Sequence, residues 1–172
     1  MNETLNNLKT RRSIRSFLTR QVEKDLLEQV LEAGTYAPTG GGRQTPVIVA
    51  VQDEATIKQL SRMNARVIGN DSDPFYGAPT VLVVLADRSR RTYLLDGAAV
   101  ITTLLNAAHA VGLGSCWIHR AKEMFESEEG KALLTRWGIE GDYEGIGLAL
   151  LGYAACPAPE PAPRKENYIV RV

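Results

Sequence analysis

Apolar positions along the chain follow two periods, one typical of helices and one typical of strands. The helical period predicts helices over residues 4–9, 22–36, 55–67, 93–111 and 127–137. Short runs rich in valine, leucine and small residues predict strands over residues 47–51, 80–86, 115–119 and 145–153. The run over residues 80–86 is nearly all valine and leucine, so this strand is expected to be buried on both faces.

Glycine and proline mark the breaks between these elements. Pro38 and the triplet Gly40-Gly41-Gly42 end the second helix, and residues 70–79 form a loop rich in Asp, Pro and Gly. Residues 156–163 hold four prolines and no periodic pattern, which predicts a stiff, extended arm. The β-branched residues at 168–172 predict a strand at the end of this arm, placed to join a neighbouring sheet. A frayed tail is the alternative.

The helix over residues 93–111 is apolar around nearly its whole circumference. No acid, lysine or arginine lies between Gly97 and Val111. Such a helix must be covered on all sides, and a domain of this size has little room to do so alone. We therefore expect a homodimer with this helix at its centre; a central helix of a monomer is the alternative.

Length, charge and cysteine content narrow the class of protein. The 172 residues predict one domain, and a composition of 44% hydrophobic and 23% charged residues is that of an ordinary globular protein. A formal net charge of zero argues against a nucleic-acid partner or an anionic membrane surface. Two cysteines, Cys116 and Cys156, form no metal-ligand cluster and fit a reducing compartment. With no export signal and no long apolar run, we expect a cytoplasmic location without membrane or metal.

The segment Arg11-Arg12-Ser13-Ile14-Arg15 carries the strongest chemical signal. Three guanidinium groups lie within five residues, and no acid stands between Thr4 and Val22. Arginine presents a planar fork of donors that matches phosphate oxygens, and serine adds one donor. The segment therefore predicts a phosphate site; a solvated helix end is the alternative. Arg88, Arg90 and Arg91 form a second basic patch, which we interpret as a solvated loop.

Together with other motifs, this segment resembles the FMN-dependent nitroreductase family in its compact form. The resemblance covers almost the whole chain, in family order and spacing. The motifs that carry it are Arg11-Arg12-Ser13-Ile14-Arg15-Ser16-Phe17, Ala37-Pro38-Thr39-Gly40-Gly41-Gly42-Arg43-Gln44, Asp73-Pro74-Phe75-Tyr76-Gly77-Ala78-Pro79, Ala108-His109-Ala110-Val111-Gly112-Leu113-Gly114-Ser115-Cys116-Trp117-Ile118 and Gly152-Tyr153.

The resemblance implies an α+β fold with a central mixed sheet flanked by helices, in an intertwined homodimer. It places FMN at the dimer interface and adds the C-terminal strand to the partner's sheet. Residues 1–153 would form the FMN-binding part, and residues 154–172 an arm that docks on the partner subunit, within one domain.

The resemblance also assigns residues to the cofactor. Arg11 and Ser13 would hold the phosphate and ribityl end with Arg12 close by, and Arg15 would lie nearer the ring. Arg164 would close over the phosphate from the arm.

Lys165 would close over the phosphate beside Arg164. The other subunit would contribute Pro38, Thr39 and Gly40, with Gln44 alongside.

Asn64 is a candidate partner for the pyrimidine edge of the flavin. Trp117, Ile118 and His119 would run past the ring and place a backbone N–H near flavin N5. The imidazole of His119 is given no role, and His109 is interpreted as a satisfied interface histidine.

The implied activity is transfer of hydride from NADH or NADPH through FMN to a small electron acceptor, such as a nitroaromatic or a quinone, by a ping-pong route. The nicotinamide donor would bind transiently, since no Gly-x-Gly-x-x-Gly element follows a strand. A nearby cation would stabilise the negative charge of the reduced flavin, and a backbone N–H would bond to N5. No catalytic side chain is assigned.

Two alternatives stay open on the sequence. The same flavin could serve dehalogenation, enone reduction or oxygen-dependent chemistry, because one fold hosts several reactions. The chain could also be a non-catalytic module that binds FMN or another phosphorylated ligand. Gly42 and Thr45-Pro46 depart from the family pattern and bear on the substrate wall, not on the FMN site.

Overall fold

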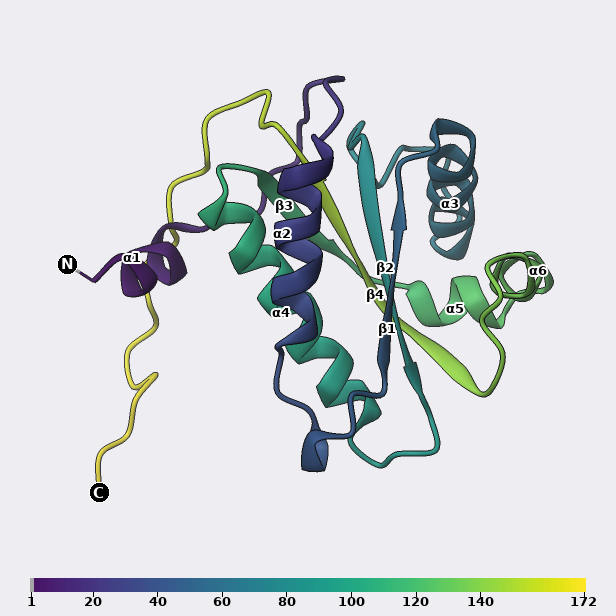
Figure 1. The fold of residues 1–172 in the computed structure, drawn as a ribbon. Coiled ribbons are helices and arrows are strands. Elements are labelled where there is room, and N and C mark those ends of the chain that lie inside the picture. Colours follow the sequence, from purple (N-terminus) through teal and green to yellow (C-terminus); the bar gives the residue numbers. More distant parts are fainter. Residues whose placement is uncertain (1) are drawn as a thin grey trace.

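The computed structural model describes residues 2–172 and contains both helices and strands (Figure 1). The elements in chain order are α1 (Glu3–Thr10), α2 (Lys24–Thr35), the 3-10 turn η1 (Gly40–Gly42), β1 (Pro46–Val51), α3 (Glu54–Val67), β2 (Thr80–Asp87), α4 (Tyr93–Ala110), β3 (Gly114–Ile118), α5 (Ala121–Glu126), α6 (Glu128–Arg136) and β4 (Tyr143–Gly152). Each helix and strand predicted up to residue 153 is present within three residues of its expected ends. The short helix α5 was not predicted.

The strands form one sheet in the order β1-β2-β4-β3. All three neighbouring pairs are antiparallel, with Val83 of β2 opposite Val49 of β1 and Leu148 of β4. The α+β fold with a central sheet is confirmed, but within the described residues only an isolated bridge, Ser13 to Ser115, is parallel. A mixed sheet would need a further strand from outside these residues.

Helices cover both faces of the sheet, as Figure 1 shows: α2 and α4 on one side, and α3, α5 and α6 on the other. The side chains of β2 alternate between the two layers. Val81, Val83 and Leu85 join the core under α3 and α5, whereas Leu82 and Val84 join the core under α4. Residues Val81–Ala86 are completely buried, as predicted for a strand covered on both faces.

An extended segment, residues 13–22, crosses one end of the sheet over all four strands, and we call it the N-terminal strap. The N–H of Ile14 donates to the Ser115 carbonyl of β3 at 2.9 Å, and that of Leu18 to the Tyr153 carbonyl after β4 at 2.9 Å. Gln21 then donates to the Pro79 carbonyl before β2 at 3.0 Å. The strap thus fixes the arginine segment against the start of β3.

Helix α4 is not covered on all sides within the chain. Its inner face is buried, including Ile101, Leu104 and Ala108, but Leu94 and Leu95 near its start are 49% and 72% exposed. The one carboxylate of α4, Asp96, is buried, so the exposed leucines form an apolar surface of the kind found at subunit interfaces. The dimer itself stays a prediction.

The C-terminal arm, residues 154–172, is attached only at its beginning. Ala154 bridges to Phe17, and the Ala155 N–H donates to the Ser16 carbonyl at 2.9 Å. The strand predicted over residues 168–172 is absent, and Ile169 and Val170 are 67% and 78% exposed. An isolated extended segment lacks backbone partners, so this strand can form only against an edge that the arm does not reach here.

None of the helices formed by residues 2–172 combines the length and the apolar character that crossing a membrane would require.

Candidate functional site

Two arginines directly after α1 carry buried nitrogen atoms without hydrogen-bond acceptors. The Arg12 Nη1 donates to the carbonyls of Lys9 and Arg11, each at 2.8 Å, but its buried Nε has no partner. The buried Nη1 of Arg11 also lacks one. A buried donor without an acceptor is costly, and a charged donor more so. A phosphate dianion would supply the missing acceptors, so these residues fit the phosphate of FMN.

His109, near the end of α4, lies beside these arginines. Its Nε2 is 2.9 Å from the Thr10 hydroxyl oxygen. Burial lowers the pKa of His109, and the nearby charges of Arg11 and Arg12 lower it further. Among residues 2–172, no acid forms an ion pair with Arg11, Arg12 or Arg15. The cluster is therefore a site of uncompensated positive charge, and His109 belongs to its surroundings.

The outer edge of β3 presents backbone donors next to this cluster. Strand β3 is at the edge of the sheet, and the Ile14 N–H reaches the Ser115 carbonyl from the outer side. Backbone groups of successive strand residues point alternately to the two sides, so Trp117 also presents its N–H outward. The strap pairs with β3 only near Ser115. A ligand beside Arg11 and Ser13 could thus accept hydrogen bonds from the rest of this edge.

Side chains of β3 divide between the two faces. The Trp117 indole lies toward α4 above Gly147, where an added Cβ would collide with the indole nitrogen. The Ile118 side chain is buried in the core on the opposite face, and His119 is exposed. Trp117 and Ile118 can therefore serve a ligand at the strand edge mainly through their backbone.

Cys116 marks where the arginine segment meets the face of the sheet under α3. Its thiol is buried, and burial raises its pKa, while Arg15, the Ser13 hydroxyl and Arg11 act in the opposite direction. Arg11, Ser13 and Arg15 are thus close enough to the thiol to influence it. Their predicted contacts with the cofactor stay a prediction.

Asn64 of α3 is buried and joins the end of β3. Its Nδ2 donates to the His119 carbonyl at 2.8 Å, and its Oδ1 accepts from Arg120 Nε at 3.0 Å and Nη2 at 2.7 Å. The Asn64 amide is thus already bonded within the chain, and its predicted contact with a flavin stays a prediction. Arg120 was not predicted, although it directly follows the residue assigned to the ring.

The loop Pro38–Gln44 lies near the beginning of α4, far from the arginines near its end. Gly40 donates its N–H to Asp96 Oδ1 at 2.9 Å, and an added Cβ at Gly40 would collide with Thr92. The 18 residues of α4 span about 27 Å. The structure therefore does not bring Pro38, Thr39, Gly40 and Gln44 together with Arg11 in one chain.

Among residues 2–172, the arm residues Arg164 and Lys165 contact only other residues of the arm. Arg164 donates to the nearby Ala162 carbonyl, and both Arg164 and Lys165 are exposed. Their predicted position over the phosphate stays a prediction.

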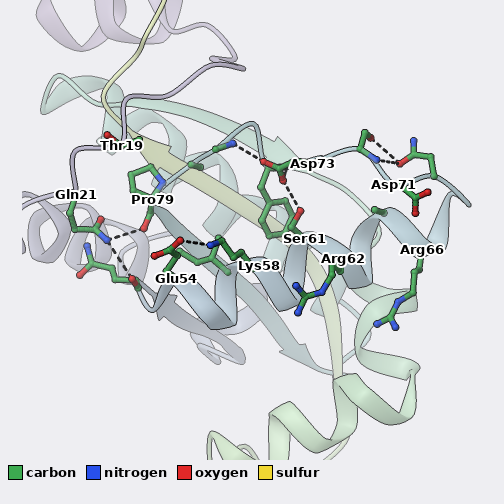
Figure 2. A pocket seen from close by; sticks show the side chains of 18 residues that line it. Thr19, Gln21, Glu54, Lys58, Ser61, Arg62, Arg66, Asp71, Asp73 and Pro79 are labelled. Carbon is green, nitrogen blue, oxygen red and sulfur yellow. Dashed lines mark hydrogen bonds and ion pairs between the residues drawn. The ribbon is translucent and has the colours of Figure 1, made fainter.

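Two cavities lie away from the arginine segment. One of about 1090 Å³ lies between α3 and the loop over residues 70–79, and Figure 2 shows Lys58 and Arg62 along its α3 wall. Lys58 pairs there with Glu54, and Ser61 donates to Asp73 at 2.6 Å. A second cavity of about 610 Å³ is lined partly by Thr39 and Gln44. The first contains no predicted site residue.

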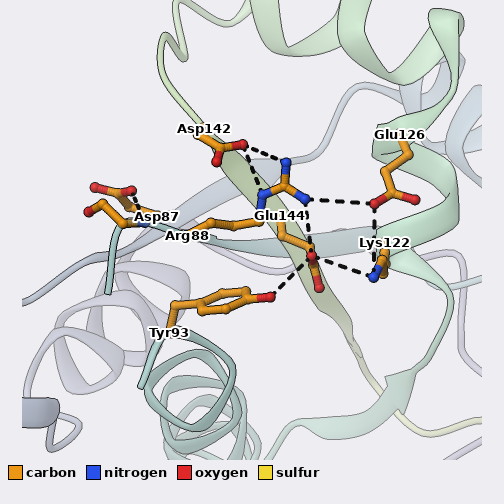
Figure 3. A network of polar contacts seen from close by, with 8 residues as sticks. Asp87, Arg88, Tyr93, Lys122, Glu126, Asp142 and Glu144 are labelled. Carbon is orange, nitrogen blue, oxygen red and sulfur yellow. Dashed lines mark hydrogen bonds and ion pairs between the residues drawn. The ribbon is translucent and has the colours of Figure 1, made fainter. Parts of the chain in front are cut away.

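A separate polar cluster surrounds Glu144 at the start of β4 (Figure 3). This buried carboxylate lies 3.6 Å from Arg88 Nη1 and 3.7 Å from Lys122 Nζ, and it accepts from the Tyr93 hydroxyl at 3.3 Å. Arg88 also pairs with Asp142 at 2.7 Å. Arg88 is therefore an ion-paired residue, not part of a solvated patch. Burial, followed by Glu144, raises the pKa of Tyr93.

Comparison with known proteins adds independent evidence. The family model described as "Nitroreductase family" matches residues 8–69 and 66–153. A relative from Archaeoglobus fulgidus, provisionally named NADH dehydrogenase/NAD(P)H nitroreductase, is 31% identical over 159 residues, covering 89% of this chain and 86% of the relative. A relative from Bacillus subtilis named FMN reductase [NAD(P)H] is 31% identical over 96 residues, which cover 56% of this chain and 36% of the relative.

Solved structures share the fold over the full length. A nitroreductase from Bacteroides fragilis, crystallised with bound FMN, matches with a TM-score of 0.91 and 28% identity, and the match covers 100% of both chains. A nitroreductase from Desulfitobacterium hafniense, also with bound FMN, matches with a TM-score of 0.89 and 25% identity over 100% of this chain and 99% of the other.

Proposed function

This chain belongs to the nitroreductase family, and we propose that it is an FMN-dependent oxidoreductase that passes hydride from NADH or NADPH to small electrophilic acceptors. The observation that carries the proposal is the pair of buried guanidinium nitrogens of Arg11 and Arg12 that lack acceptors. They lie beside the outer edge of β3, where residues 2–172 form a backbone bridge only at Ser115. An anionic, elongated ligand along that edge would accept hydrogen bonds from both the arginines and the strand backbone.

Each segment near this edge has a distinct role in the proposal. Arg11, Arg12 and Ser13 bind the phosphate, whose charge-assisted hydrogen bonds are the strongest available here. The backbone of residues 117–119 lies along the ring, and Arg15 supplies a positive charge near it.

The chemistry divides between the cofactor and the chain. Bound FMN supplies the hydride-accepting and hydride-donating atom, and the protein supplies placement and electrostatics. The cationic surroundings of Cys116 favour negative charge that develops on the ring. No side chain is required as a nucleophile, and none is assigned as an acid. Donor and acceptor use the same space in turn, which gives ping-pong kinetics.

We propose that the site is completed by a second copy of the chain. The loop Pro38–Gln44 and the arginines lie near opposite ends of α4, so a two-fold partner packed antiparallel on this helix would bring its loop to the arginines. The exposed Leu94 and Leu95 provide apolar surface for that contact.

The arm is proposed to complete the same assembly. Strand β1 is the other edge of the sheet and pairs only with β2 among the described residues. The partner's residues 168–172 could pair with this edge, while Arg164 and Lys165 reach the phosphate. Such pairing would also shield an edge that is otherwise open to aggregation.

The small acceptors we propose are nitroaromatics, quinones or similar conjugated electrophiles. We also propose a cytoplasmic location, because Cys116 and the exposed Cys156 are both free thiols.

The test is anaerobic mixing of the FMN-loaded protein with NADH and, separately, with NADPH. The flavin absorbance band should disappear with at least one donor and return when a quinone or a nitroaromatic is added. An Arg90→Ala variant, changed in an exposed loop, controls for loss of surface charge and should behave as the wild type. A band that persists with both donors would contradict the proposal.

A further inference from the structure

Arg120, between β3 and α5, has a backbone conformation that is uncommon for a residue with a side chain. Its φ and ψ are 76° and 11°, in the left-handed region. A non-glycine residue held there costs on the order of 1 kcal/mol, and such conformations cluster at functional sites. Glycine would adopt this backbone without strain, but it would not provide the guanidinium group.

The guanidinium of Arg120 is held by a single neutral group. Its Nε and Nη2 both donate to Asn64 Oδ1, at 3.0 and 2.7 Å, while Asn64 Nδ2 donates to the His119 carbonyl at 2.8 Å. The Asn64 side chain is completely buried, which limits the access of water to these three hydrogen bonds. Three residues thus form a closed clamp that fixes the turn after β3.

An amide accepts the hydrogen bonds of Arg120 but does not neutralise its charge. Within residues 2–172, Arg120 forms no ion pair with an acid. It is only half-buried, and its Nη1 donates no hydrogen bond in the described chain. A positive charge is therefore fixed in place and partly removed from water without a counter-charge.

The clamp lies at the opposite end of β3 from the phosphate-binding arginines. Ser13, two residues after Arg11, bridges to Ser115 at the start of the strand, and Arg120 follows His119 after its end. A five-residue strand spans about 17 Å. A flavin mononucleotide whose phosphate is bound at the start of β3 would carry its ring toward the end where Arg120 lies.

We propose that Arg120 is a positioning residue that, through Asn64, fixes the turn after β3 and places an uncompensated positive charge beside the flavin ring. The charge stabilises the reduced cofactor more than the oxidised one and so raises the midpoint potential of bound FMN. This inference rests on the proposed function, because it requires FMN at the edge of β3.

The test compares the midpoint potential of FMN bound to the wild type and to Arg120→Gly, Arg120→Lys and Arg62→Ala. Glycine adopts the left-handed backbone freely, so Arg120→Gly removes the charge without adding strain. Arg62 of α3 is exposed and is a matched control for loss of one positive charge. Potentials are measured by stepwise anaerobic reduction against a reference dye.

Arg120→Gly should reduce the preference for reduced over oxidised FMN about tenfold, which is about 30 mV for a two-electron couple. Arg120→Lys should recover most of this difference, and Arg62→Ala should match the wild type. A purely structural role would weaken both redox states equally and leave the potential unchanged, and that result would overturn the inference. The proposed function has a separate failure, namely wild-type protein that does not bind FMN or is not reduced by either nicotinamide donor.

Discussion

The cluster around Glu144 and the arginine cluster beside β3 are both polar and partly buried, but only the first is complete within the chain. Arg88 and Lys122 surround Glu144, and Glu126 and Asp142 complete the pairing, as the dashed lines in Figure 3 show. Arg11 and Arg12 have buried donors without acceptors. Unsatisfied charge, more than charge itself, therefore distinguishes a binding site from a structural network.

Removing the arm should have the largest effect, because it tests whether the incomplete cluster is completed by a partner. A chain ending at Ala155 should be monomeric by sedimentation velocity and should bind FMN at least roughly 100-fold more weakly by calorimetry. The double variant Arg164→Ala/Lys165→Ala is the matched control, which should stay dimeric while FMN binding weakens. A truncated chain that remains a dimer with full FMN affinity would refute the role of the arm.

Glu144→Gln should damage the complete cluster. It leaves Arg88 and Lys122 without their buried counter-charge and should lower the free energy of unfolding by about 1–2 kcal/mol in urea. The loss stays below the roughly 3–5 kcal/mol of a fully buried pair, because Arg88 and Lys122 are 41% and 52% exposed.

Glu126→Gln is the control for Glu144→Gln, because the Glu126 side chain is 52% exposed. This variant should lower the free energy of unfolding by less than about 0.5 kcal/mol. FMN affinity should be unchanged in both variants. Equal stability of Glu144→Gln and wild type would mean that this network is not structural.

Arg11→Ala, in contrast to Glu144→Gln, should leave the stability of the fold nearly unchanged. Within residues 2–172 its guanidinium has an unsatisfied donor and no ion pair, so the unfolding free energy of the FMN-free protein should change by no more than about 0.5 kcal/mol. Urea denaturation of the FMN-free protein measures this. A loss comparable to that of Glu144→Gln would show that Arg11 serves the fold.

The smallest expected effect is a pH dependence from His109. Burial and the charges of Arg11 and Arg12 hold its pKa below 6.5, so it is neutral in the folded protein where the unfolded chain begins to bind a proton. Its contribution to stability is full above about pH 6.5 and is lost as the pH falls toward the folded pKa. His109→Gln should therefore shrink the stability difference between about pH 7.5 and about pH 5.5.

Thermal or urea unfolding of the FMN-free protein at both pH values measures this difference. His119→Gln, at the second histidine of the chain, is the control and should retain it. An unchanged pH dependence in His109→Gln would argue against the charged surroundings of this residue.

The sequence predicted secondary structure best where residues close together in the chain determine it. The buried strand over residues 80–86 and the helix ends followed from apolar runs, proline and glycine. The helix α5 has only six residues and no room for a helical period, so it was missed. The strand over residues 168–172 has β-propensity, but propensity cannot form a strand without a neighbouring edge.

In the candidate site, too, contacts between residues far apart in the chain could not be predicted. The arginine cluster was visible because its residues are adjacent in sequence, and the structure leaves buried nitrogens of Arg11 and Arg12 without acceptors. The contact between Asn64 and Arg120 joins residues 56 positions apart, and nothing local predicts it. The left-handed backbone of Arg120 is likewise set by tertiary contacts.

The most direct measurement compares the affinities of FMN and riboflavin, which differ only in the phosphate. The wild type should prefer FMN by at least roughly 100-fold, and Arg11→Ala/Arg12→Ala should lose this preference while its affinity for riboflavin is retained. Equal affinities of the wild type for both ligands, or an unchanged preference in the double variant, would contradict a phosphate site built from these two arginines.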